Sequence, residues 1–527
     1  MNNKSGIYNV FLLFSLFLVL LFICFCVYTF AQNNIPIFED CNYFIFRKND
    51  IFNQFFLNVY HGRYLSNIII IILTSFLPKL CGLHPITFFQ TVAPVIKGIF
   101  LFILFFQIGR YYYRNRAYDF ILPFIILSLY VMYQLIFAFT FEDIEYAAFY
   151  GFTFPFILFN LFWFQVIKLC DDNDKKPNIF LLTFLAFIVG ISTEFTNITS
   201  LVALLVLFVF RKDIRKNLIL PIMFVFSGLF LYYANQGSLI KSVILDNKGS
   251  VFVNWESFKQ LPLYIKPFLN SLFNISIHEY GVFLLLIVIL TIIITLFQNK
   301  KFDKVLVPFS LLSGCLVFSF ALIGNPENAP NGSWLFHFDV INQYRIFYLI
   351  IFLYLLNLMK TKRIIKDLIV IIFFVTSICF ISLNNKDFLK EVKSNGLKTA
   401  ILNVKLNEEN TFDKDEANYY YHSKNRYIFE KINLYNLKNN LPLSLIINTK
   451  YNVPAFWTNS EFLFGEYCYM LYVYGLSGDF DNFRNRNFDS IEEAYEQYLK
   501  DGGSVITPEE ASRADFQNLL ITEKVKK

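Results

Sequence analysis

The chain has 527 residues, of which 56% are hydrophobic and only 16% are charged. Soluble domains carry roughly 25% charged residues, so this composition excludes an ordinary soluble protein and indicates a membrane protein. The formal net charge of +6 does not indicate a nucleic-acid partner, because the basic residues gather in short segments between apolar runs, where they set orientation in a bilayer.

Eleven apolar stretches come close to the roughly 20 residues that a helix needs to cross a hydrocarbon core of about 30 Å. We expect membrane-spanning helices near 8–31, 89–109, 118–140, 148–169, 178–193, 195–211, 217–234, 280–298, 304–324, 345–360 and 366–383. The first stretch is longer than the about 7–15 apolar residues of a signal-peptide core, so we expect it to remain as an anchor. Residues 1–383 are therefore predicted to form an α-helical polytopic membrane domain.

Lys and Arg are concentrated in alternate connections between these stretches, and basic connections stay on the cytoplasmic side. The basic residues are Lys4, Arg110, Arg114, Arg116, Lys168, Lys175, Lys176, those of the segment 211–216, Lys300, Lys301, Lys304, Lys360, Lys362, Arg363 and Lys366. The loops 32–88, 235–279 and 325–344 are longer and poorer in positive charge. The sequence therefore predicts a multi-pass protein of the cell membrane with a cytoplasmic N terminus. An odd number of spans places the chain after Leu383 outside.

The segment from Ile68 to Leu77 tests this topology, because it is apolar but is followed by Pro78 and Lys79 and then by Cys81 and Gly82. Counting it as a span would move the basic cluster 110–116 to the outer side, against the charge rule. We therefore expect a short helix that lies at the outer interface or is partly re-entrant.

The C-terminal region 384–527 changes composition abruptly, because Lys, Asn, Asp and Glu become common and no apolar run is long enough to span. Capping-box patterns start at Ser490 and Thr507, and Gly502 with Gly503 would end the first of these two helices. The segments 443–448 and 462–474 could form strands. We expect a small soluble extracytoplasmic domain of mixed α/β structure.

The first outer loop, 32–88, carries the polar residues of greatest interest. Glu39 and Asp40 follow the first span closely, and His61 and Arg63 come later in the loop. Two carboxylates at a membrane surface, with a His and an Arg, form an acid/base and anion-binding set. Taken alone, adjacent carboxylates are common, and a solvated juxtamembrane loop with a turn at Gly62 explains these residues better.

The layout of residues 1–383 resembles the glycosyltransferase-C superfamily of polytopic membrane enzymes. These have a cytoplasmic N terminus, about a dozen spans and an acidic pair early in a large first outer loop, and many carry a soluble outer C-terminal domain. Glu39 and Asp40 take the position of the acidic pair, and His61-Gly62-Arg63-Tyr64 is similar to the family's aromatic, then Asn-Gly-Arg segment. His61 stands where the family usually has Asn, and Cys41 stands where it has an acidic or aromatic residue.

The resemblance implies an inverting transferase that moves a sugar from a polyprenyl-phosphate donor to a glycan or lipid acceptor at the outer membrane face. It implies that Asp40 is the base, with Glu39 as its neighbour or alternative. It also implies that Arg63 and Arg345 hold the lipid phosphate, since a guanidinium can donate two hydrogen bonds to it. The resemblance also allows a divalent cation, Mg²⁺ or Mn²⁺, to bind at the acidic pair.

The eight cysteines of the chain are not spaced like the ligands of a metal site.

Two site candidates lie nearer the expected spans. Glu194 falls in a turn between two short spans, where a carboxylate close to hydrocarbon is costly unless it has a partner. A helix cap at the interface explains Glu194 equally well. Arg345 stands at the entrance of a span, where snorkelling of its side chain is the alternative to phosphate binding. We expect both residues, together with His61 and Arg63, in the substrate site.

Two other functions remain open. A flippase or transporter of a polyprenyl-linked saccharide would need charged residues along the middle of several spans, but the expected span interiors are almost free of charge, with Lys97 as the chief exception. A noncatalytic envelope-assembly protein would use its C-terminal domain to bind a partner. In each case the bilayer is the surrounding medium, and no nucleic acid is expected.

Overall fold

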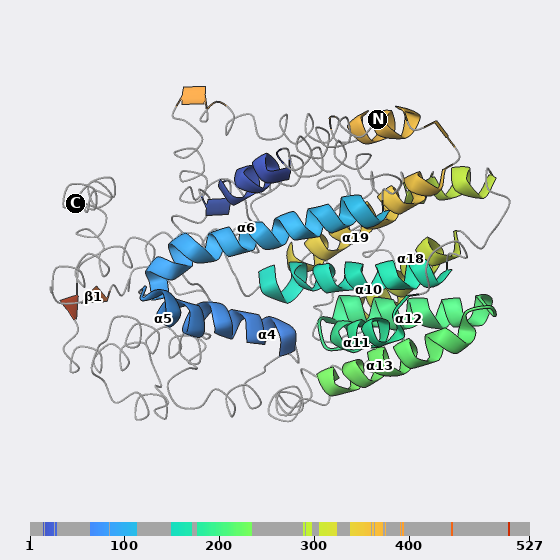
Figure 1. Cartoon of the computed structure of the whole chain (residues 1–527), viewed down its shortest axis with the longest axis horizontal. Helices are drawn as coiled ribbons and strands as arrows, with labels where there is room; N and C mark the ends of the chain where they lie inside the picture. Colours follow the sequence, from blue (N-terminus) through green and yellow to red (C-terminus); the bar gives the residue numbers. More distant parts are fainter. Residues whose placement is uncertain are drawn as a thin grey trace, which may run out of the picture. The chain divides into compact units, whose positions relative to one another are not determined.

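The computed structural model of this chain is mostly helical (Figure 1). It describes the residues 14, 16–25, 27–28, 64–83, 85–112, 149–170, 177–233, 288–289, 291–297, 305–323, 338–359, 361–362, 364–372, 375, 390, 393–394, 444–445 and 504–505. The chain forms two compact units. The first unit consists of Met1–Cys26, Phe52–Ile70 and Ile96–Asn384. The second unit consists of Val27–Ile51, Ile71–Val95 and Asn385–Lys527.

The described elements follow one another in chain order as a series of apolar helices. They are α4 (Tyr64–Ile71), the π-helix η1 (Ile72–Phe76), α5 (Leu77–Cys81), α6 (Pro85–Tyr112), the π-helix η2 (Phe149–Thr153), α10 (Pro155–Cys170), α11 (Ile179–Gly190), α12 (Glu194–Phe210), α13 (Arg215–Tyr233), α18 (Leu306–Ile323) and α19 (Phe338–Leu358). Seven of the eleven expected spans fall on these helices, and the expected span 118–140 lies outside the described residues.

Three described helices are long and apolar enough to cross a membrane: Thr91–Arg110, Phe149–Cys170 and Arg215–Tyr232. Shorter apolar helices are Leu16–Phe25, Ile179–Gly190, Glu194–Phe210, Leu306–Ser319 and Ile346–Leu358. A helix satisfies all of its backbone hydrogen bonds within itself, which is the condition for a backbone to cross hydrocarbon.

Helix α12 lies at the centre of the first unit, packed against α10, α11, α13 and α18. Its tightest neighbour is α18, where Gly314 lies against the backbone of Thr199. Gly190 of α11 and Gly228 of α13 approach each other in the same way. Helices in lipid associate through close packing of small residues, because hydrocarbon supplies no hydrophobic drive between them.

Helices α10, α12 and α19 run in the same direction. Phe195, at the start of α12, contacts Phe156 at the start of α10, with ring centroids 5.6 Å apart, and Phe347 of α19 at 5.4 Å. At the other end, Arg211 directly after α12 donates a hydrogen bond from Nη2 to the carbonyl oxygen of Cys170, 3.2 Å away, at the end of α10. The first unit therefore has two distinct ends.

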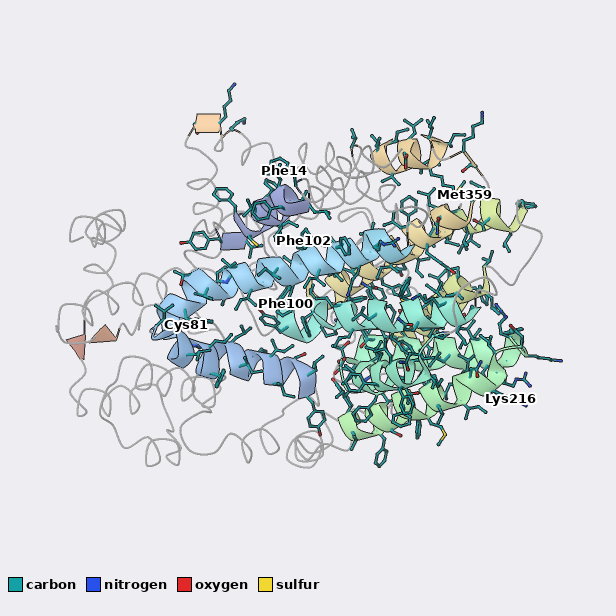
Figure 2. The ribbon with its side chains drawn as sticks, in the orientation of Figure 1. Phe14, Cys81, Phe100, Phe102, Lys216 and Met359 are labelled. Atoms are coloured by element: carbon teal, nitrogen blue, oxygen red, sulfur yellow. The ribbon has the colours of Figure 1, made fainter. Side chains whose placement is uncertain are left out.

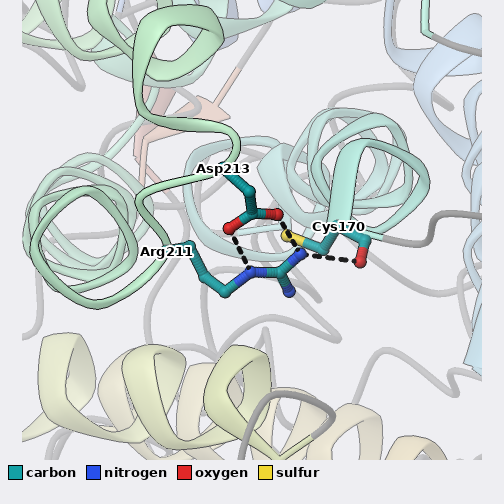
Figure 3. A network of polar contacts seen from close by, with 3 residues as sticks. All are labelled: Cys170, Arg211 and Asp213. Carbon is teal, nitrogen blue, oxygen red and sulfur yellow. Dashed lines mark hydrogen bonds and ion pairs between the residues drawn. The ribbon is translucent and has the colours of Figure 1, made fainter.

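One end of this helix bundle carries the basic connections, and we call it the basic end. It holds Lys168, Arg211, Lys212, Arg215 and Lys216. Arg211 binds Asp213 with two hydrogen bonds, from Nε at 2.9 Å and from Nη2 at 2.6 Å (Figure 3). Arg215 donates to the carbonyl oxygens of Phe208 and Val209, which end α12. These two arginines thus cap the carbonyl ends of α10 and α12, in keeping with the negative end of a helix dipole.

The apolar segment from Ile68 to Leu77 is helical, and the helix extends beyond Pro78 to Cys81. The π-helix η1 lies where the ring of Pro78 would clash with the carbonyl four residues earlier. The helix ends at Gly82, whose φ is +62°, and the Leu83 N–H donates to the Pro78 carbonyl oxygen at 3.0 Å. This is a Schellman motif, and Gly82 ends the helix.

The second unit contains the described strands, a parallel pair of two residues each. Strand β1 (Ser444–Leu445) pairs with β2 (Ser504–Val505), with Ser444 opposite Ser504. Strand β1 falls within the expected strand 443–448. The expected strand 462–474 and the helices that start near Ser490 and Thr507 lie outside the described residues.

Candidate functional site

The acidic pair and the motif of the first outer loop lie outside the described residues: Glu39, Asp40, His61 and Arg63. The structure describes the chain again from Tyr64, which directly follows Arg63 and starts α4. The Tyr64 hydroxyl donates to the carbonyl oxygen of Leu231, 3.5 Å away in the last turn of α13. Because α13 starts at the basic end, α4 begins at the opposite end of the bundle.

Glu194 lies at that same opposite end, which we call the Glu194 end. It is the first residue of α12, and Thr193 is the N-cap. Thr193 and Thr196 form a capping box, in which each side-chain oxygen accepts from the other residue's backbone N–H at 3.3 Å. The negative charge of Glu194 is stabilised by the partial positive charge of the helix N terminus. Glu194 is half-buried and lies one residue inside the helix, so Thr193 rather than Glu194 is the N-cap.

Phe195 connects the start of α12 to the other helices at the Glu194 end. Its ring contacts Phe318 of α18 at 4.9 Å and Tyr344 of α19 at 5.6 Å between centroids. The Tyr344 hydroxyl shares a 2.6 Å hydrogen bond with the hydroxyl of Ser319 in α18. This cluster of three aromatic rings and two hydroxyls fixes α18 and α19 against the start of α12.

Arg345 follows Tyr344 directly in α19, just as Glu194 precedes Phe195 directly in α12. The contact between Phe195 and Tyr344 therefore brings the backbone at positions 194 and 345 to the same level of the bundle. Among the expected site residues, the structure places these two at one end and leaves the acidic pair, His61 and Arg63 outside its described part.

Sequence reasoning missed a set of polar side chains buried inside the bundle. Those of α10 and α12 are Asn160, Thr196, Asn197, Thr199 and Ser200. Trp163 Nε1 donates to the Ser200 hydroxyl at 3.1 Å, and Asn197 Nδ2 donates to the Gly190 carbonyl oxygen at 3.3 Å. The available signal was the polar run 196–200 at the start of an apolar stretch.

Two oxygen atoms of this set, Asn197 Oδ1 and Thr199 Oγ1, make no hydrogen bond within the described part of the chain. A buried polar atom without a partner costs about 1–3 kcal/mol. Ordered water is the usual partner of such atoms. The first half of α12 is therefore the polar part of the bundle interior, and the second half, from Leu201 to Phe210, is apolar.

Lys97 is a further ionisable group inside an apolar helix. It lies in α6, only 4% exposed, with Nζ 4.8 Å from the centroid of the Phe149 ring in η2. A cation over an aromatic face is stabilised by the ring quadrupole. Phe100, three residues further along α6, packs edge-on against Tyr150 and Phe154. These contacts hold α6 against the start of the α10 helix, on the side away from the basic end.

No group of three or more His, Cys, Asp or Glu residues that could hold a metal ion occurs among the described residues. The acidic pair Glu39 and Asp40, at which the resemblance allows a divalent cation, lies outside them.

Comparison with protein families, with curated proteins and with solved structures finds no match to this chain.

The two ends of the bundle differ in the chemistry that they can support. At the basic end, Arg211 and Arg215 are occupied by helix carbonyls and by Asp213. At the Glu194 end, the half-buried Glu194 starts α12 directly before Phe195, whose ring contacts Tyr344, and the Tyr64 hydroxyl of α4 donates to the Leu231 carbonyl oxygen.

Proposed function

We propose that this protein is an outward-facing membrane glycosyltransferase of the glycosyltransferase-C type. It would transfer a sugar from a polyprenyl-phosphate donor to a cell-surface glycan or lipid acceptor, with inversion at the anomeric carbon. The observation that carries the proposal is the contact between Phe195 and Tyr344, since it brings the backbone at positions 194 and 345 to one level at the end opposite the basic connections. An anion-binding Arg and a carboxylate at that level suit a lipid-phosphate sugar at the outer face.

Each candidate site residue has one role in the proposed reaction. Asp40 takes the proton of the acceptor hydroxyl, whose oxygen attacks the anomeric carbon. The bond between the anomeric carbon and the phosphate oxygen breaks, and the polyprenyl phosphate leaves as an anion. Arg63 and Arg345 stabilise that anion through paired hydrogen bonds. Glu39 tunes Asp40 or shares a divalent cation, Mg²⁺ or Mn²⁺, with it, and His61 and Glu194 bind the sugar hydroxyls.

The proposed topology follows from the same two ends. Eleven spans, a cytoplasmic basic end and an outer C-terminal α/β domain put the acidic pair on the Glu194 side of the bilayer. Three described helices have the length and composition to cross a membrane. Lys168, Arg211, Lys212, Arg215 and Lys216 all lie at one end of the bundle, which supports a single cytoplasmic side.

The test is transfer of a labelled sugar from polyprenyl phosphate in membranes that contain each variant at equal amounts. Asp40→Asn keeps the shape of the side chain but removes its basic lone pair, so the rate should fall by about 10²–10⁴-fold. Arg63→Lys should also impair transfer, because lysine lacks the planar fork. Asp213→Asn is the matched control, since Asp213 is a carboxylate at the basic end. Near-normal rates in both Asp40→Asn and Glu39→Gln would show that the first outer loop does not supply the catalytic carboxylate.

Glu194 has its own test, which separates substrate binding from helix capping. Glu194→Gln should raise the KM for the donor, because the amide cannot accept from sugar hydroxyls with the strength of a carboxylate. Thr193→Ala removes the N-cap and should lower stability by about 1 kcal/mol. If both variants change only the melting temperature, Glu194 serves the helix and not the substrate.

A further inference from the structure

The basic end of the bundle has two kinds of basic residue. Arg211 is 7% exposed and is bound to Asp213 and to the Cys170 carbonyl oxygen. Arg215 is bound to the last carbonyls of α12, with its guanidinium 5.1 Å from the Phe208 ring centroid. Lys212 and Lys216, in contrast, are exposed. Neither ammonium group makes a hydrogen bond or ion pair within the described part of the chain.

The charge around these two lysines is not neutralised locally. The segment 211–216 contains four basic residues and one acidic residue, Asp213, and both oxygens of that carboxylate accept hydrogen bonds from Arg211. Lys212 and Lys216 therefore leave a positive patch at the edge of α12 and α13. Figure 2 labels Lys216 at this end of the bundle.

An apolar strip begins at the same place. On α13 the exposed apolar residues beyond Lys216 return at each turn of three or four positions, one or two per turn, which puts them on one broad face of the helix. They are Ile219, Leu220, Met223, Phe224, Phe226, Phe230 and Leu231, all between 39% and 65% exposed. Only 28% of Arg215–Tyr232 is buried, against 56% of Thr91–Arg110 and 65% of Phe149–Cys170. Among the three described candidate spans, α13 therefore has the largest surface that lipid chains can cover.

We propose that Lys212 and Lys216 bind the phosphate head group of an anionic phospholipid, with one acyl chain along the Ile219–Phe230 face of α13. The two positive ammonium groups neutralise the negative charge of the phosphate, and the exposed apolar face contacts the acyl chain. A helix span whose basic end lies at the head-group level places both at the depths that a phospholipid requires. This site is separate from the Glu194 end, and it does not depend on the proposed transferase reaction.

The experiment is native mass spectrometry of the full-length protein in detergent, titrated with phosphatidylglycerol or with phosphatidylcholine that has the same acyl chains. The wild type should bind phosphatidylglycerol more tightly. Lys212→Gln and Lys216→Gln should each weaken that binding about fivefold, and the double variant about 30-fold, while phosphatidylcholine binding stays unchanged. The preference should fall as salt rises.

Two variants complete the design. Lys390→Gln with Lys393→Gln removes the same charge from two exposed lysines outside α12 and α13, and it should leave lipid preference unchanged. Lys212→Arg with Lys216→Arg keeps the charge and should retain the preference. Equal binding of both lipids by the wild type would overturn the proposal. The proposal would also be overturned if the Lys212→Gln/Lys216→Gln variant lost no more affinity for phosphatidylglycerol than the Lys390→Gln/Lys393→Gln variant.

Discussion

Gly314 of α18 lies so close to Thr199 of α12 that a Cβ atom at residue 314 would clash with the Thr199 carbonyl oxygen. Gly314→Ala should therefore push the two helices apart, and we expect a loss of about 1–3 kcal/mol in the free energy of unfolding, as for other overpacked sites. The measurement is thermal unfolding in detergent. Ser313→Ala, at a partly exposed neighbouring position, is the control and should melt near the wild type. Equal melting temperatures of Gly314→Ala and the wild type would show that the helices do not meet there.

The hydrogen bond between Ser319 and Tyr344 should show energetic coupling between α18 and α19. In a double-mutant cycle of Ser319→Ala and Tyr344→Phe, we expect a coupling of about 0.6 kcal/mol, and at most about 1.7 kcal/mol, as found for hydrogen bonds in membranes. The control cycle pairs Tyr344→Phe with Ser313→Ala, whose hydroxyl donates within α18 to the Phe309 carbonyl oxygen. This pair should be additive within about 0.5 kcal/mol. Additivity in both cycles would contradict the 2.6 Å contact.

The ion pair at the basic end should make stability depend on pH in the acid range. The hydrogen bonds from Arg211 hold the pKa of the Asp213 carboxyl below its ordinary value. Such a group stabilises the fold fully above its unfolded-state pKa of about 3.9, and the contribution is lost as pH falls through the lowered native pKa. The Asp213 side chain is 51% exposed, so we expect at most about 1 kcal/mol. Asp213→Asn should thus melt slightly below the wild type at pH 7, with a gap that closes below about pH 4. A gap that is the same at pH 7 and pH 3 would argue against the pairing.

The proposed topology can be checked with single cysteines and a membrane-impermeant maleimide in intact cells. Cysteines at positions 114, 176, 215, 301 and 362 should react only after the cells are permeabilised, because these positions fall in the basic connections. A cysteine at position 450 should react without permeabilisation. Labelling of position 114 from outside would mean that the helix from Tyr64 to Cys81 spans the membrane. The topology would then have to be rebuilt.

The sequence predicts where helices lie better than it predicts which helices touch. The apolar stretch 195–211 matches α12 within one residue at each end, because Thr193 caps its start and Arg211 follows its last helical residue. The partners of α12 could not be foreseen, since an apolar run shows little about which face meets protein and which meets lipid. Gly314 became informative only when its contact with the Thr199 backbone was known.

Local backbone chemistry accounts for another difference. The apolar run from Ile68 to Leu77 is followed by Pro78 and Lys79, yet the helix continues to Cys81 because the π-helix 72–76 accommodates Pro78. Gly82 ends it instead, with a positive φ that favours glycine. At the candidate site, Glu194 and Arg345 were chosen separately from the sequence, and their shared level depends on the contact of Phe195 with Tyr344. The roles of Glu39, Asp40, His61 and Arg63 stay predictions.

The central claim is that this protein breaks the bond between a sugar and a polyprenyl phosphate, and reconstituted proteoliposomes test it most directly. The purified protein is supplied with a polyprenyl-phosphate sugar that is labelled in the sugar, and free polyprenyl phosphate and labelled acceptor product are measured together. We predict that both appear in equal amounts with the wild type and with Asp213→Asn, and that both are lost with Asp40→Asn. A labelled donor that crosses the bilayer intact, without release of polyprenyl phosphate, would contradict the transferase and identify a flippase.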